Sequence, residues 1–181
     1  MNSEQAVALV INHLEELGIE YMIVGALSCN LYGVPRATVD ADIVVDFRDF
    51  SLVNFCEGLG DDFKLDKQMM LEMLTGSRRN VLHFLPTGFD IELFFLNDDA
   101  HHQERFRRRR ELPFPELGQP AKVQTAEDLI IQKLRWARRK DLDDIVSVMS
   151  VSRERIDWAY VRHWTEIHGT TELLDDLRSE I

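Results

Sequence analysis

Two aspartates two positions apart, inside a short run of β-branched residues, constrain the fold of this chain more than any other feature. In a strand over 39–46, Val39, Ala41, Ile43 and Val45 lie on one side and Asp40, Asp42 and Asp46 on the other. A period of two predicts a β-strand with one buried face. Carboxylates at positions i and i+2 of a strand lie roughly 6.5–7 Å apart and point the same way, so Asp40 and Asp42 can converge on a hard cation. A solvent-facing strand surface explains the same pattern, because Asp46 continues it, and the strand alone leaves both interpretations open.

The segment before this strand predicts a turn that can face an anion. Residues 19–24 are short, apolar and rich in β-branched side chains, which favours a buried strand. The strand ends at Gly25-Ala26, where a short helix to Leu31 is expected. Backbone N–H groups at such a turn can hold phosphate oxygens, although an ordinary tight turn has the same sequence.

A hairpin further along the chain offers a third carboxylate. Residues 81–85 and 89–95 predict two strands joined across Pro86-Thr87-Gly88, and the second strand carries Asp90 and Glu92 on one face. Two acids on one strand, a third acid on another and a phosphate-binding turn are the equipment for Mg²⁺-dependent phosphoryl-type transfer.

These residues carry a family resemblance. The stretches Val24-Gly25-Ala26-Leu27-Ser28 and 33–45 resemble the core signature of the DNA polymerase β-like nucleotidyltransferase superfamily. More narrowly, the Gly-Val-Pro-Arg-Ala-Thr before the Asp pair is similar to the minimal bacterial nucleotidyltransferases of the AbiEii-toxin and aminoglycoside-nucleotidyltransferase type. Weaker likenesses lie in 127–134 and 139–144. The turn departs from the family pattern at Ala26, where many relatives have Gly or Ser.

The resemblance implies roles for named residues. Asp40 and Asp42 would bind two Mg²⁺ (or Mn²⁺) ions, and Asp90 would be the third, metal-binding and activating acid, with Glu92 as the second candidate. The donor would be a nucleoside triphosphate (NTP), whose phosphates would lie at the turn. The nucleotide-binding residues expected on this basis are Gly25, Ala26, Ser28, Arg36 and Lys133.

Two of these nucleotide contacts have ordinary structural explanations as well. Arg36 can meet a phosphate or pair with a catalytic acid, because Arg binds carboxylates and phosphates bidentately, but a surface ion pair would explain it equally. Lys133 lies on an otherwise apolar helix face. It can reach the triphosphate, or it can extend its ammonium group to solvent as surface lysines commonly do.

The rest of the chain divides into a mixed and a helical part. We expect an α/β (α+β) fold: a mixed β-sheet nucleotidyltransferase core over 1–97, a connector over 98–124, and a small C-terminal helical bundle over 125–181 packed on the core. Helices are expected near 49–59 and 67–74 as well. The connector holds three prolines, the pair His101-His102 and the basic run Arg107 to Arg110. We interpret the histidines as polar connector residues rather than metal ligands, and the arginines as a solvated run paired with surplus acids.

Composition narrows the function classes. The formal charge of −11, from 32 acidic and 21 basic residues, disfavours a general nucleic-acid coat. No apolar run approaches the roughly 20 residues of a membrane helix, the N-terminus lacks a signal-peptide pattern, and the two cysteines match no zinc or redox spacing. We therefore expect a cytoplasmic protein without a membrane partner. No Walker-type loop appears, which disfavours a P-loop ATPase.

The function expected from these features is Mg²⁺-dependent transfer of a nucleoside monophosphate (NMP) from an NTP to an acceptor hydroxyl, with release of pyrophosphate. The resemblance implies an acceptor that is a small molecule, RNA or protein, and a place in a toxin–antitoxin or defence pair with a partner protein encoded nearby. The alternative is a catalytically silent protein of the same fold that acts as a binding partner or antitoxin. A metal-binding regulatory domain is a weaker third interpretation.

Overall fold

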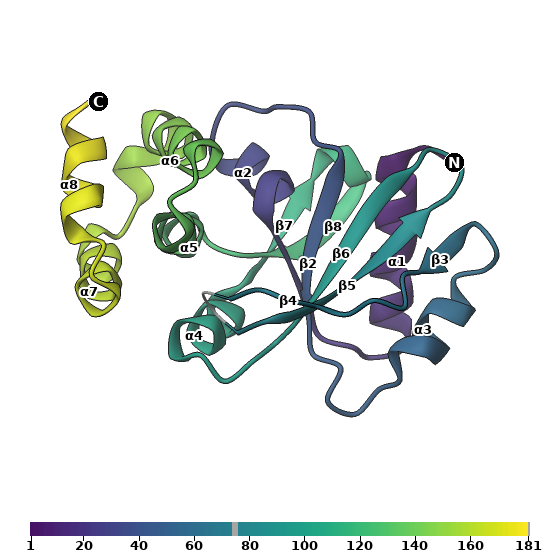
Figure 1. Ribbon diagram of the computed structural model, residues 1–181. Coiled ribbons are helices and arrows are strands. Elements are labelled where there is room, and N and C mark those ends of the chain that lie inside the picture. Colours follow the sequence, from purple (N-terminus) through teal and green to yellow (C-terminus); the bar gives the residue numbers. More distant parts are fainter. Residues whose placement is uncertain (74–75, 181) are drawn as a thin grey trace.

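A computed structural model describes residues 1–73 and 76–180 as a mixed sheet with helices on both faces and a helical bundle at one end (Figure 1). The strands follow the order β3-β5-β6-β2-β1-β8-β7 across the sheet, and β4 pairs with β5 beside this path. Their bounds are β1 Tyr21–Val24, β2 Asp40–Val45, β3 Phe63–Leu65, β4 Met70–Leu71, β5 Arg78–Phe84, β6 Phe89–Phe95, β7 Arg110–Phe114 and β8 Gln119–Val123.

One face of the sheet is covered by α1 (Ser3–Glu16) and α3 (Leu52–Gly58). Asn2 begins α1 with a capping box. The Asn2 side chain accepts from the backbone N–H of Gln5, and the Gln5 side chain accepts from the backbone N–H of Asn2. The apolar positions of α1 recur at helical spacing and pack on the apolar face of β1, β2 and β6. They form the main core with the buried side chains of Ala6, Val7, Val10, Ile11, Leu14, Ile23, Ala41, Ile43, Val45, Ile91 and Leu93.

The opposite face of the sheet divides into an apolar end and an acidic end. Met22, Val44 and Phe94 pack under Phe106 of α4 (Ala100–Arg108) at the apolar end. The acidic positions of β2 and β6 occupy the same face at the other end, because side chains two positions apart on a strand share a face. Helix α2 (Gly25–Tyr32) begins directly where β1 stops, beside this acidic end.

The helical bundle comprises α5 (Ala126–Trp136), α6 (Arg139–Ser152), α7 (Trp158–His168) and α8 (Thr171–Ser179). A short 3₁₀ turn, η2 (Arg153–Arg155), lies between α6 and α7, and another, η1 (Pro115–Leu117), lies between β7 and β8. The core of the bundle includes Leu129, Ile130, Ile145 and Leu174, and it extends to Cys29 of α2. The bundle therefore docks on the helix that follows β1, as Figure 1 shows. The mixed α/β class with a C-terminal helical bundle is confirmed.

The stretch from 98 to 124 is more than the connector expected from its prolines. It contributes α4 and the strands β7 and β8, and β8 pairs in parallel with β1 through Ile23 and Val123. Pro113 and Pro120 sit opposite each other in the β7–β8 ladder. Proline cannot donate to a ladder, so it argues against a strand in the sequence. Here one proline lies in the edge strand β7, and the other is at the second position of β8.

The helix expected near 67–74 does not form over residues 67–73, which hold only the two-residue strand β4, while residue 74 lies outside the described part. His101 and His102 lie in helix α4 rather than in an irregular connector. Both are buried in α4, where His101 Nε2 lies 3.1 Å from Asp128 Oδ1 and His102 Nδ1 lies 2.6 Å from Asn97 Oδ1.

The basic run is largely paired with acids, as expected. Arg107 contacts Glu104, Arg108 contacts Asp128 and stacks on Tyr160, and Arg109 contacts Glu20. Over the described residues, no helix is long and apolar enough to span a bilayer.

Candidate active-site cleft

A cleft of about 660 Å³ lies between the acidic end of the sheet and the α5–α6 corner. The first residues of α2, the loop before β2, the strands β2, β5 and β6, and the start of α6 all reach it. The lining residues used below are Gly25, Ala26, Arg36, Asp40, Asp42, Arg79, Glu92, Phe94, Lys133, Trp136, Arg138 and Lys140. Most of the site residues expected from sequence are therefore brought together.

The register between β2 and β6 decides which acids meet. The two strands are parallel, and they place Asp40 beside Asp90 and Asp42 beside Glu92. Glu92 lines the cleft with Asp40 and Asp42, whereas Asp90 is not among the residues that line it. The Asp90 carboxylate instead lies 2.7 Å from Nδ1 of His83 on β5. The geometry favours Glu92 over Asp90, the reverse of the ranking drawn from the family pattern.

Asp42 is the most constrained of the acids. A Cβ added to Gly25 would lie 1.8 Å from Asp42 Oδ2, and Gly25 has a φ of +62°, so only glycine fits this turn. Burial, followed by the charges of Glu92 and Asp40, raises the pKa of Asp42 to about 7. The Asp40 carboxylate accepts from Thr38 Oγ1 at 2.8 Å, and Glu92 is paired with Arg79.

The carboxylates of Asp40, Asp42 and Glu92 are the type of ligand that a divalent cation prefers, but they are not yet close enough together to coordinate one. Among the described residues, no three His, Cys, Asp or Glu side chains are grouped closely enough to hold a metal ion. Burial is the main cause of the raised pKa of Asp42, and repulsion from Glu92 and Asp40 adds to it. A bound cation relieves that repulsion, and hard cations prefer carboxylate oxygens. Asp40, Asp42 and Glu92 are the residues that would hold it, with Glu92 leaving Arg79.

The turn at Gly25 places the start of α2 at the cleft. Val24 precedes α2 without a side-chain cap, so the first N–H groups of the helix lack that partner. Gly25 and Ala26 both line the cleft. Ser28 does not: it is buried, its hydroxyl donates to the Gly25 carbonyl at 2.9 Å, and it accepts from Gln124 Nε2 at 2.7 Å. Ser28 therefore stabilises the turn through hydrogen bonds and does not line the cleft.

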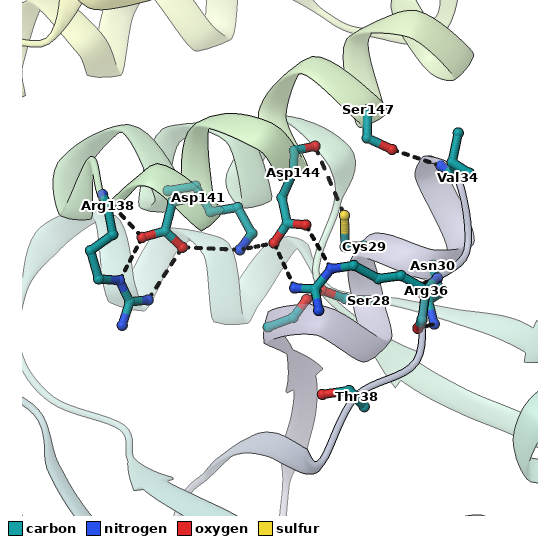
Figure 2. A network of polar contacts seen from close by, with 12 residues as sticks. Ser28, Cys29, Asn30, Val34, Arg36, Thr38, Arg138, Asp141, Asp144 and Ser147 are labelled. Carbon is teal, nitrogen blue, oxygen red and sulfur yellow. Dashed lines mark hydrogen bonds and ion pairs between the residues drawn. The ribbon is translucent and has the colours of Figure 1, made fainter.

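The other wall of the cleft is a chain of alternating charges, shown in Figure 2. Arg36 donates to both oxygens of Asp144 at 2.9 and 3.0 Å. Lys133 Nζ lies 2.7 Å from Asp144 Oδ2 and 3.2 Å from Asp141 Oδ1. Asp141 also accepts from Arg138 Nε at 2.6 Å. This Arg36–Arg138 network joins the loop before β2 to the helical bundle.

The network decides between the alternatives left open for its two cations. Lys133 is 5% exposed and paired twice, so it is not a lysine that extends to solvent. Arg36 pairs with Asp144 of the bundle rather than with a cleft acid. Burial favours a higher pKa for Asp144, but hydrogen bonds from Arg36 and Lys133 outweigh it and hold the pKa below its usual value. Both cations still line the cleft.

Arg79 and Trp136 belong to the cleft, and sequence reasoning missed both as site residues. Arg79 precedes the predicted hairpin strand by two residues, and only the pairing of β5 with β6 brings it to Glu92. Trp136 follows Lys133 on α5 and stacks under Arg138, with the guanidinium 4.9 Å from the ring centroid. Lys140 also lines the cleft and makes no hydrogen bond or ion pair with the described residues.

Comparison with known structures identifies the fold. The antibiotic-resistance factor ANT(2'')-Ia in complex with adenylyl-2''-tobramycin superimposes with a TM-score of 0.63 and 14% identity, over 95% of this chain and 99% of that one. The solution structure of the same factor gives 0.58 at 14% identity over the whole of both chains. The chain has a nucleotidyltransferase fold. A nucleotidyltransferase candidate from H. pylori gives 0.56 at 12% identity, over 99% of this chain and 81% of that one. No protein-family model and no curated protein sequence matches the chain significantly.

Proposed function

We propose that this protein is a nucleotidyltransferase that moves an NMP from an NTP to an acceptor hydroxyl and releases pyrophosphate. The observation that carries the proposal is the register of β2 and β6, which sets Asp42 beside Glu92 in a cleft that Lys133, Arg138 and Lys140 line from the helical bundle. Neighbours of the same fold include one aminoglycoside nucleotidyltransferase, ANT(2'')-Ia, which supports the reaction class.

Some residues of the cleft bind the β- and γ-phosphates, and others act where the acceptor attacks the α-phosphorus. The N–H groups at Gly25 and Ala26 bind the β- and γ-phosphates, since the uncapped start of a helix attracts anions. Lys133 and Lys140 face the same phosphates from the bundle side. The acceptor oxygen forms a bond to the α-phosphorus, the bond from that phosphorus to the bridging oxygen breaks, and the hydroxyl proton passes to a carboxylate of the cleft.

Asp40, Asp42 and Glu92 hold the divalent metal, Mg²⁺ or Mn²⁺. When bound, the metal supplies positive charge to the α-phosphate and to the entering and leaving oxygens. Arg79 keeps Glu92 in position before the metal arrives. Asp90 and Ser28 have no direct part in this arrangement, because neither lines the cleft.

A small molecule is the acceptor that the observations favour. ANT(2'')-Ia is seen with an adenylylated small molecule, adenylyl-2''-tobramycin. The Arg107–Arg110 run, the feature that would suit RNA, lies mostly in ion pairs and does not line the cleft. A toxin–antitoxin role and a partner protein encoded nearby rest on the resemblance in sequence, and co-purification of the native protein with a bound protein tests them.

Thermal unfolding with each of four NTPs, with and without Mg²⁺, tests the proposal. We expect at least one NTP to raise the unfolding temperature only when Mg²⁺ is present, because the ligand binds the folded state alone. Asp42→Asn should abolish the shift. Asp46→Asn is the matched control, since Asp46 follows the same strand but pairs with Arg48 outside the cleft. Absence of any shift with the wild type at millimolar NTP and Mg²⁺ favours the catalytically silent alternative.

A further inference from the structure

A small second cavity lies behind the cleft and shares a wall with it. Its volume is about 10 Å³, which is room for one water-sized group. Glu72, Phe94 and Trp136 line both the cleft and the cavity, so the two spaces meet at two aromatic side chains and one carboxylate. Arg105 of α4 and Gln132 of α5 also line the cavity.

Three polar atoms around this cavity are buried without a hydrogen-bond partner among the described residues: Nε of Arg105, Oε1 of Gln132 and Nε1 of Trp136. Arg105 is 4% exposed and Gln132 is 3% exposed. Arg105 also forms no ion pair with the described residues. Native proteins satisfy the great majority of buried polar groups, so three unsatisfied atoms from three side chains at one cavity indicate a place built for a ligand atom.

The electrostatics agree with this interpretation. Burial lowers the pKa of the Arg105 guanidinium to about 10, against the fields of Asp128, Asp99 and Asp42. The buried guanidinium keeps its charge at neutral pH, and its Nε atom has no acceptor among the described residues. It therefore favours a ligand atom that carries negative partial charge.

The donor and acceptor types specify the ligand atom further. Arg105 and Trp136 only donate, whereas Oε1 of Gln132 accepts. A carbonyl oxygen has two lone pairs and fits a one-atom cavity between two donors, and a neighbouring ring N–H would meet Gln132. Guanine and uracil present this keto–imino edge. Adenine and cytosine present an amino group, whose hydrogens would point at the two donors.

We propose that this cavity is the base-recognition subsite of the cleft and that it selects NTPs with a keto base, guanine or uracil. The inference rests on the proposed function. The ring of the base would lie in the cleft against Phe94 and Trp136, with only its carbonyl oxygen in the cavity. Lys133 precedes Trp136 by three residues on α5, less than one helical turn, so a nucleotide can span from this subsite to the phosphate-binding wall.

Binding titrations with matched nucleotides test the proposal. The pair ITP and ATP differs at position 6 of the purine and in the proton on N1. In the presence of Mg²⁺ we expect ITP, GTP or UTP to bind the wild-type protein at least tenfold more tightly than ATP and CTP. Gln132→Leu and Arg105→Met should each remove most of that preference. Arg107→Met, on the same helix but exposed, should keep it.

The outcomes separate this proposal from the proposed function. Tripolyphosphate with Mg²⁺ should bind wild type and Gln132→Leu equally, because it has no base. Equal affinity for all four NTPs, or a preference for ATP or CTP, overturns the base subsite while leaving the transferase intact. If neither NTPs nor tripolyphosphate bind, the proposed function fails first. Circular dichroism checks the fold of Arg105→Met, and Gln132→Leu keeps the test decisive if that variant unfolds.

Discussion

The carboxylate of Asp42 lies directly against Gly25, at the point where β1 ends and α2 begins. A side chain at position 25 would occupy the space of Asp42 Oδ2, since the added Cβ lies 1.8 Å from it. The phosphate-binding turn and the metal-binding acid are therefore packed on each other. Because Gly25 has no side chain, the Asp42 carboxylate has room to pack against the turn. The phosphate-binding and metal-binding parts of the proposed site are therefore coupled.

Alanine substitutions at Gly25 and Gly18 separate the cost of backbone strain at positive φ from the loss of NTP binding at the cleft. Gly25→Ala should abolish NTP binding, because Asp42 must move and the φ of +62° is strained for alanine. Gly18→Ala is the matched control: Gly18 has a φ of +68° with nothing within 4 Å of the added Cβ. It should cost only about 1–2 kcal/mol of folding free energy and leave binding unchanged. Unfolding curves and NTP titrations of both variants check this, and normal binding by Gly25→Ala would contradict it.

The assignment of the third acid is tested by two amide variants. Glu92→Gln should lower the transfer rate by about 10²–10³-fold, the usual loss for one electrostatic group at a reacting centre. Asp90→Asn should lower it less than about tenfold, since its carboxylate pairs with His83 away from the cleft lining. Single-turnover transfer assays with labelled NTP measure both. A reversed order would restore Asp90 as the third acid.

The Arg36–Arg138 network should contribute to stability as well as to the cleft. Asp144 and Lys133 have side chains only 5% and 6% exposed, so Asp144→Asn leaves a buried ammonium with a weaker partner. We expect a loss of about 3 kcal/mol, equivalent to a fall of roughly 6–12 °C in unfolding temperature. Asp175→Asn removes a half-exposed partner of Arg162 and should change stability by less than about 1 kcal/mol. Equal effects of the two substitutions would show that the network adds no more than a surface pair.

Stability should decrease below about pH 6.5, the ordinary pKa of histidine. Burial, followed by the charge of Arg105, lowers the pKa of His102 to about 2, and burial lowers that of His168 to about 4. Below pH 6.5 these two histidines bind fewer protons in the folded state than in the unfolded state. They outweigh the one opposing proton on Asp42, whose pKa is raised to about 7, so unfolding becomes easier as the pH falls from 6.5. His102→Gln should flatten this slope by up to about 1.4 kcal/mol per pH unit. Denaturant titrations from pH 7.5 to 5 measure the slope, and His163→Gln, at an exposed site, should leave it unchanged.

Patterns within short stretches of sequence predicted the parts of the site that a single strand or turn forms. The alternation around Asp40 and Asp42 indicated the strand and its acidic face, and the glycine after residues 19–24 indicated the turn. The fold class followed from the order of these patterns, and the solved structures confirm it.

The order of the two candidate third acids depends on how strands far apart in sequence align, which local patterns do not encode. Asp90 and Glu92 lie on the same face of one strand, and only the β2–β6 register sets Glu92 beside Asp42. Arg79 was missed for the same reason, because only the pairing of β5 with β6 brings it to the cleft. Arg105 was missed because it reaches the cavity through the packing of α4 on the sheet. The strands β7 and β8 were not predicted because each contains a proline, Pro113 or Pro120, and proline argues against a strand in the sequence.

The parallel pairing of β8 with β1 has a consequence for synthesis of the chain. Strand β1 has β2 as one neighbour, and its other neighbour, β8, is about a hundred residues downstream. A nascent chain emerging from the ribosome can therefore pair β1 with β2 early but exposes the second edge of β1 until residue 123 has been made. A fragment that stops at residue 97 would carry Gly25, Asp42 and Glu92 on a sheet with that edge uncovered. We expect such a fragment to aggregate rather than to form a minimal catalytic unit.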